Sequence, residues 1–221
     1  MEIVYYVRPG DKNEELRYSL RSLRNLPHER VWVVGHKPPW VTGVEYVPGN
    51  TGTGDQANAV ANLLLACEHV EADRMIVFND DFYVMDPVLA VPTYHAGPLA
   101  ERVKTAGGAY KTHLRVAQER LTEMGYEQPL AWTLHIPVAV WRAKLARILG
   151  MLTGPTLPEW RTMYGNLAGA LGEQAEDVKV RRRSHPIPAG PFLSSSDTTF
   201  GVVRPLLKSL FPTPSPYEVA A

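Results

Sequence analysis

The order of strand-like and helix-like segments in residues 1–90 restricts the folds open to this chain. Short runs rich in β-branched and aromatic residues alternate with segments of helical periodicity. The helical segments begin at Asn13 and Asp55, and the strand-like runs cover residues 3–7, 30–35, 43–47 and 74–78. Because such alternation is typical of a mainly parallel sheet with helices on its faces, the sequence predicts a Rossmann-like α/β fold.

The rest of the chain has a more helical pattern. Helices are predicted over residues 110–124, 138–149 and 158–171, and short strands over residues 131–134 and 177–180. Residues 211–221 carry three prolines and are expected to lie loosely on the surface. The chain shows no repeat and no clear linker. We therefore expect one domain over residues 1–210, with an α/β half over residues 1–90, a mainly helical half over residues 91–210 and a Pro-rich tail.

Composition excludes several classes of protein. The 23 basic and 23 acidic residues balance, which removes the argument for a globally basic nucleic-acid-binding surface but leaves local patches open. The single cysteine, Cys67, forms neither an internal disulfide nor a zinc knuckle. The N-terminus is too acidic for a signal peptide, and the longest nearly apolar stretch, residues 58–67, is shorter than the roughly 20 residues of a membrane span. We expect a soluble cytoplasmic protein with no membrane partner. The sequence does not indicate its oligomeric state.

The sharpest local motif is Asn79-Asp80-Asp81, directly after the apolar run of residues 74–78. Ligands of open α/β sheets bind at the carboxyl ends of the strands. Two carboxylates at such an end suit Mg²⁺ or Mn²⁺, which prefer oxygen ligands and often share substrate phosphates. The alternative is an acidic turn in solvent between two strands.

Three other polar features each have two interpretations, and a fourth, at residues 194–197, has one. The loop of residues 49–54 (G-N-T-G-T-G) is either a phosphate-binding or a flexible connection. His135, before Ile136-Pro137, is either structural or catalytic. The basic run of residues 179–185 holds phosphate or a nucleic-acid backbone, or is a solvated strand end. Residues 194–197 form a polar turn with one carboxylate, Asp197.

Several of these segments together resemble the Stealth family of nucleotide-sugar-dependent sugar-phosphate transferases, which are relatives of GT-A glycosyltransferases. The most specific block is N-E-E-L-R-Y-S-L-R-S-L at residues 13–23, close to the family's N-E-L-R-Y-S-L-R-S. The similarity covers residues 4–88 well and scattered positions beyond. The other similar segments are the opening strand and turn at 4–11, V-W-V-V-G at 31–35 with P-W-V at 39–41, D-Q-A-N-A-V at 55–60, N-D-D at 79–81 and H-I-P at 135–137.

The resemblance implies a GT-A-like fold and a nucleotide-sugar donor, with donor binding in residues 1–90 and the acceptor side in residues 91–210. It implies that Asp81 holds a Mn²⁺ or Mg²⁺ ion against the donor diphosphate. Arg17 and Arg21, at i and i+4, project from one helix face toward phosphate, unless that face is merely solvated. The expected donor-binding residues are Arg8, Arg17, Arg21, Asn58 and Asn79; the candidate catalytic residues are Asp80, His135 and Asp197; and the expected acceptor or phosphate contacts are Arg181, Arg182 and Arg183.

We therefore expect a metal-dependent glycosyltransferase that moves a sugar from a nucleotide-sugar to an acceptor hydroxyl. Arg8 stands where the family usually has aspartate, which weakens the case for sugar-phosphate transfer more than the case for the donor class. Sugar-phosphate transfer to a saccharide is the second enzymatic hypothesis. A non-catalytic nucleotide-sugar or nucleic-acid binding module is the alternative of another class. The acceptor hydroxyl belongs to a saccharide, to a protein or, given residues 181–183, to a hydroxymethylated DNA base as in virus-type DNA modification.

Overall fold

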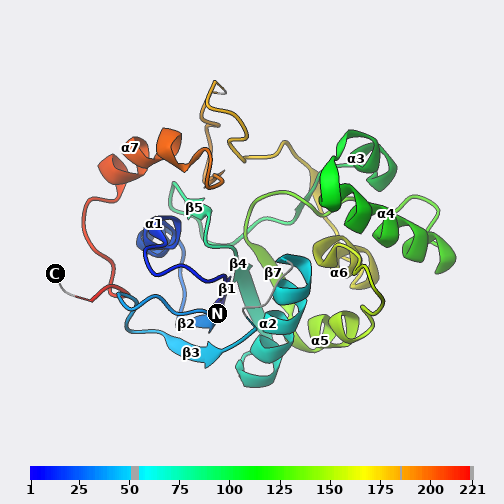
Figure 1. Cartoon of the computed structure of the whole chain (residues 1–221), viewed down its shortest axis with the longest axis horizontal. Coiled ribbons are helices and arrows are strands. Elements are labelled where there is room, and N and C mark those ends of the chain that lie inside the picture. Colours follow the sequence, from blue (N-terminus) through cyan, green and yellow to red (C-terminus); the bar gives the residue numbers. More distant parts are fainter. Residues whose placement is uncertain (51–54, 185, 220–221) are drawn as a thin grey trace.

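A five-stranded sheet forms the centre of the molecule in the computed structural model, which describes residues 1–50, 55–184 and 186–219 (Figure 1). The strand order is β3-β2-β1-β4-β7. Strands β3, β2, β1 and β4 are parallel, and β7 runs antiparallel along β4. This confirms the predicted α/β fold with a mainly parallel sheet. The strands are β1 (Glu2–Val7), β2 (Val31–Gly35), β3 (Glu45–Pro48), β4 (Arg74–Phe78) and β7 (Val138–Trp141).

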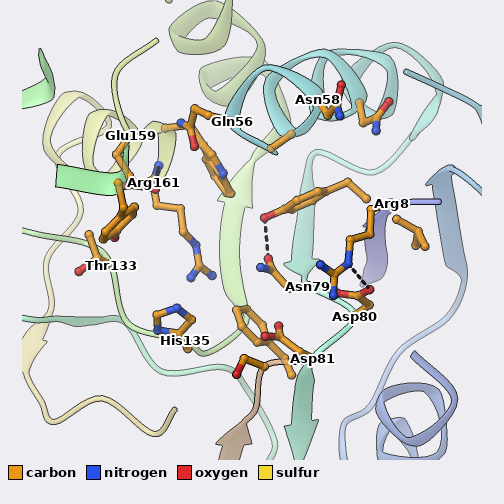
Figure 2. A pocket seen from close by; sticks show the side chains of 18 of the residues that line it. Arg8, Gln56, Asn58, Asn79, Asp80, Asp81, Thr133, His135, Glu159 and Arg161 are labelled. Carbon is orange, nitrogen blue, oxygen red and sulfur yellow. Dashed lines mark hydrogen bonds and ion pairs between the residues drawn. The ribbon is translucent and has the colours of Figure 1, made fainter. Parts of the chain in front are cut away.

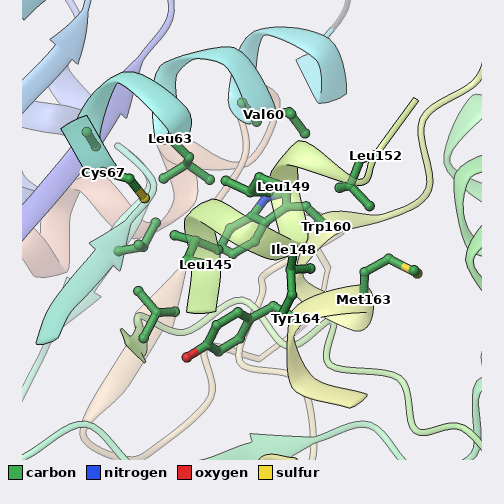
Figure 3. Close-up of a cluster of buried hydrophobic side chains, with 14 of the residues drawn as sticks. Val60, Leu63, Cys67, Leu145, Ile148, Leu149, Leu152, Trp160, Met163 and Tyr164 are labelled. Carbon is green, nitrogen blue, oxygen red and sulfur yellow. The ribbon is translucent and has the colours of Figure 1, made fainter. Parts of the chain in front are cut away.

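Side-chain alternation along the strands gives the sheet two apolar faces. In β1, Val4 packs into the core beneath α2, α5 and α6, whereas Ile3 and Tyr5 pack toward α1 on the other face. Figure 3 shows the first of these cores, where Leu63 of α2 meets Leu145 of α5 and the residues around them. The helices are α1 (Glu14–Ser22), α2 (Asp55–His69), α3 (Leu99–Thr105), α4 (Gly108–Glu123), α5 (Arg142–Gly150), α6 (Trp160–Leu167) and α7 (Phe200–Leu210).

Smaller elements surround this centre. A 3-10 turn at Leu23–Asn25 follows α1. Two short two-stranded sheets pair β5 with β9 and β6 with β8. Their strands are β5 (Phe82–Val84), β6 (Tyr94–His95), β8 (Glu173–Gln174) and β9 (Phe192–Ser194). Among the described residues, no helix is long and apolar enough to cross a lipid bilayer.

The predicted helix over residues 138–149 is wrong in its first turn. Val138–Trp141 forms β7, and α5 begins at Arg142. Val138 pairs with Val77 and Val140 with Met75, so β7 satisfies the backbone groups along one edge of β4. Long-range strand pairing therefore overrides the local helical pattern. Residues 131–134 are irregular rather than a strand, and in the predicted strand over 177–180 only an isolated bridge forms, between Lys179 and Ser194.

The C-terminal segment is packed, contrary to the prediction of a loose tail. Phe211 is buried, and the buried carboxylate of Glu218 accepts two hydrogen bonds from the Arg21 guanidinium at 2.7 and 2.8 Å. His28 and Tyr217 share a side-chain hydrogen bond of 2.6 Å. Phe211 before the prolines and Tyr217 and Glu218 after them anchor this segment, which the prolines alone do not reveal.

Candidate functional site

The carboxyl ends of β1 and β4 define the candidate site. Strands β2 and β3 lie on one side of β1 and β4 lies on the other, so the strand order reverses between β1 and β4. Open α/β sheets bind their ligands at such a switch point. The chain places Arg8 directly after β1, and Asn79, Asp80 and Asp81 directly after β4. These four residues, called the sheet wall below, line a cleft of about 390 Å³ (Figure 2).

The opposite side of the cleft comes from the second half of the chain and from α2. Figure 2 shows His135 and Arg161 across the cleft from Arg8, with Gln56 and Asn58 projecting from α2. Lys179 and Asp197 also line the cleft. The residues of the second half that form this side, called the far wall, are Thr133, His135, Glu159, Trp160 and Arg161.

The two carboxylates of the sheet wall have different partners. The Asn13 amide donates a hydrogen bond of 2.9 Å to Asp80 Oδ2, and the same side chain caps α1 through the Leu16 N–H at 3.0 Å. Burial, together with repulsion from Asp81, raises the pKa of Asp80. Lys179 Nζ lies 2.9 Å from Asp81 Oδ2, and Asp81 Oδ1 is buried without a hydrogen-bond partner in the described part of the chain.

Arg8 connects several acids at the edge of the cleft. Its guanidinium donates a hydrogen bond to Asp197 and lies 3.7 Å from Asp80 Oδ2 and 3.6 Å from Glu15 Oε2. Arg8 and Asp197 are thus held together, from positions 189 residues apart. No local pattern in the sequence pairs these two residues.

Glu15 is a site residue that the sequence analysis missed, because a glutamate in the first turn of a helix is ordinary. The carboxylate is buried and accepts a hydrogen bond of 2.7 Å from the Ser195 hydroxyl. Burial raises its pKa to about 7. The available signal was a buried polar stripe on α1, since Glu15, Ser19 and Ser22 recur at i, i+4 and i+7 beside the leucine stripe.

His135 is held by Asp177 beside the cleft. The His135 Nδ1 lies 3.0 Å from Asp177 Oδ2, and the His135 backbone N–H donates to the same carboxylate at 3.1 Å. Burial lowers the pKa of the His135 ring, which favours its neutral form. When Nδ1 donates to Asp177, the neutral ring keeps Nε2 as a proton acceptor.

Several predicted phosphate contacts lie away from the cleft. Arg17 stacks on Trp40 at 4.4 Å, and both Arg17 and Arg21 pair with Glu218; they line a neighbouring open basin. Arg181 donates to Asp177 at 2.6 Å, and Arg182 and Arg183 are exposed. Of the Gly-rich loop, Asn50 is bound through its backbone to the Asn62 amide, and residues 51–54 lie outside the described residues.

The side chains around Asp80 and Asp81 do not fit the predicted divalent metal ion as ligands. No group of three or more His, Cys, Asp or Glu side chains gathers around a possible metal position within residues 1–50, 55–184 and 186–219. The lysine ammonium already neutralises Asp81, and Asp80 is bound by Asn13 and faces Arg8. A Mg²⁺ or Mn²⁺ ion at Asp81 would stand beside that ammonium and be repelled by it.

No protein-family model and no curated protein matches the chain. Solved structures do resemble it. The galactosyltransferase LgtC in complex with donor and acceptor sugar analogs superposes with a TM-score of 0.54 at 11% identity, over 97% of this chain and 96% of that chain. An active-site mutant of LgtC gives a TM-score of 0.52 at 11% identity, over 95% of each chain.

These likenesses confirm the predicted GT-A-like fold. At 11% identity they show the fold alone. The finer resemblance to the Stealth family stays a prediction.

Proposed function

We propose that this protein is a glycosyltransferase that binds a nucleotide-sugar in the cleft and transfers the sugar to an acceptor hydroxyl. The observation that carries the proposal is the position of Asn79, Asp80 and Asp81 at the switch point of a GT-A-like sheet, facing His135 across a cleft. The likeness in fold to a galactosyltransferase supports it.

The sheet wall is suited to the donor. Its polar groups come from strand ends and are held by hydrogen bonds, such as the 2.6 Å bond from the Tyr6 hydroxyl to Asn79 Oδ1. Arg8 and Lys179 bring positive charge to the cleft, where the donor diphosphate is negative. Asn58, on the adjoining face of α2, adds a polar side chain. Residues 1–90 thus form the donor half of a single domain, and residues 91–210 form most of the acceptor side.

The far wall is suited to proton transfer. His135 Nε2 takes the proton of the acceptor hydroxyl while the acceptor oxygen bonds to the sugar's anomeric carbon. The bond from that carbon to the diphosphate breaks, and the nucleoside diphosphate leaves with the electron pair. Asp177 orients the ring and stabilises the imidazolium that forms. Asp197 and Asp80, which also line the cleft, are the competing candidates for this base.

Arg161 keeps His135 in position. Its guanidinium donates to the backbone carbonyls of Leu134 and Ile136 at 2.6 and 2.5 Å, one residue on either side of His135. Both hydrogen bonds are buried. The fixed backbone lets a single histidine present its ring to the cleft in one orientation.

The experiment is a thermal-shift panel of nucleotide-sugars, followed by assay of nucleoside diphosphate release with saccharide, protein and hydroxymethylated DNA acceptors. A cognate donor at 100 times its Kd stabilises the native state by about 2.7 kcal/mol. Asp80→Asn is expected to reduce this shift, and Asp86→Asn, at an exposed position outside the cleft, is the matched control. A panel without any shift overturns the proposal. Binding without release of nucleoside diphosphate leaves a non-catalytic binding module, and release of nucleoside monophosphate indicates sugar-phosphate transfer.

A further inference from the structure

The backbone around Lys179 directs its side chain into the cleft. Lys179 forms a bridge with Ser194, and Val180 N–H donates to Ser194 O at 2.9 Å, so this segment runs alongside β9. Neighbouring side chains in extended backbone point to opposite sides. Val180 is buried in an apolar core with Leu193, and Lys179 accordingly lines the cleft.

Lys179 and Asp81 form a mostly buried ion pair. The ammonium lies 2.9 Å from Asp81 Oδ2, and the two side chains are only 16% and 11% exposed. The described residues give this ammonium one hydrogen-bond partner, Asp81. A lysine ammonium has three N–H donors, so two of them remain for a ligand in the cleft.

The pairing places a lysine ammonium where the sequence predicted a divalent metal ion. Asp81 Oδ1 is the one buried acceptor of this carboxylate that suits a metal, because it has no hydrogen-bond partner among the described residues. A metal bound there would still share the carboxylate with the ammonium, and like charges this close repel strongly in a desolvated cleft. The groups around Asp81 therefore favour a single cation there, and that cation is the Lys179 ammonium.

We propose that Lys179 supplies the positive charge that meets the donor diphosphate at Asp81, so that donor binding requires no divalent metal ion. The inference rests on the proposed nucleotide-sugar function. The ammonium donates to phosphate oxygens and stabilises the negative charge that develops on the leaving diphosphate as its bond to the sugar breaks. Asp81 holds the ammonium in place.

The test measures binding of free nucleoside diphosphates and their sugars to the whole chain, by calorimetry and thermal shift, in EDTA and in Mn²⁺. We expect the same Kd within about threefold in both buffers. Lys179→Met should weaken binding in EDTA by 30-fold or more, by the order of a lost charged hydrogen bond, and Lys179→Arg should retain most of it. Lys208→Met, at an exposed lysine on α7, is the control and should bind as the wild type does.

Lys179→Met leaves a buried carboxylate unpaired and is expected to lower the melting temperature. The double variant Lys179→Met with Asp81→Asn removes both charges and tests binding in a folded protein. Asp81→Asn alone keeps the lysine and should still bind nucleotide in EDTA. Binding of the wild type only in Mn²⁺, or undiminished binding by the folded double variant in EDTA, overturns this inference and leaves the proposed function standing. Absence of binding in both buffers overturns the proposed function.

Discussion

The two walls of the cleft are built by different kinds of backbone. The sheet wall consists of residues that directly follow two buried parallel strands, β1 and β4. Strand β1 pairs with β2 over five residue pairs and with β4 over four, and these pairings set the register. Around His135 the far wall is irregular backbone, held by hydrogen bonds that Arg161 donates to it and that the His135 N–H donates to Asp177. The sheet wall is thus fixed by main-chain pairing, and the far wall depends on a few buried charged side chains. We therefore expect mutations to affect the two walls differently.

The largest effect is expected from Arg161→Met, which removes the support of the far wall. The change leaves the carbonyls of Leu134 and Ile136 buried without donors, at a cost of about 3–5 kcal/mol in the free energy of unfolding. Urea denaturation measures it. The control is Arg115→Met, because Arg115 is exposed and its pair with Glu119 contributes less than about 1 kcal/mol. A loss for Arg161→Met as small as that of the control would mean that the far wall does not depend on this side chain.

The next effect concerns chemistry rather than stability. His135→Ala is expected to lower turnover by about 100-fold or more, with little change in donor affinity or melting temperature, because the ring acts as a base and the segment stays held by Arg161. Single-turnover kinetics and calorimetry measure the two quantities. Asp177→Asn should lower turnover and shift the pH profile, since Asp177 sets the ring's tautomer.

A large loss of stability in His135→Ala, with near-normal turnover per folded molecule, would assign His135 to the core. The same comparison on Asp197→Asn would then show whether the acid paired with Arg8 is the base.

The contrast between the walls also explains what the sequence could predict. Asn79-Asp80-Asp81 was recognised because its signal is local: a buried strand followed by acids, in a fold whose ligand edge is known. Arg161 lay inside a predicted helix, and periodicity does not show that a charged residue turns inward to bind carbonyls contributed 25 and 27 residues earlier. The sequence pattern predicts a helix over residues 138–141, because a short segment does not show that it will pair with the distant edge of β4. In the sequence Lys179 stands out only as part of a basic run, because its contact with Asp81 spans 98 residues.

A third prediction concerns Glu15, which lies 3.6 Å from Arg8 of the sheet wall. Its folded-state pKa is about 7, against an ordinary value of 4.5, so the folded protein keeps a proton that the unfolded chain releases between these pH values. The free energy of unfolding of the wild type should therefore fall, relative to Glu15→Gln, as the pH rises from about 4.5 to about 7. The slope is at most about 1.4 kcal/mol per pH unit.

Urea denaturation across this pH range measures the difference. Glu14→Gln is the control for removing a carboxylate from the first turn of α1, because the Glu14 side chain is 42% exposed and pairs with Arg204 at 2.8 Å. A constant difference between the wild type and Glu15→Gln would show that Glu15 is ionised throughout. In that case burial would not keep a proton on Glu15 near neutral pH.

The smallest expected effect concerns the acceptor, on the outer side of the far wall. All three arginines are exposed, but Arg181 is bound to Asp177, whereas Arg182 and Arg183 lie outside the cleft. Of the three, these two can therefore contact a nucleic-acid backbone without disturbing His135. If they do, replacing both with serine should weaken duplex DNA binding and reduce the slope of log K against log salt by about one for each lost phosphate contact. Fluorescence anisotropy over a salt series measures the slope, with donor affinity as the control that should not change. If the intact protein binds no DNA even at low salt, the acceptor is a saccharide or a protein hydroxyl, and the two arginines belong to the solvent-exposed surface.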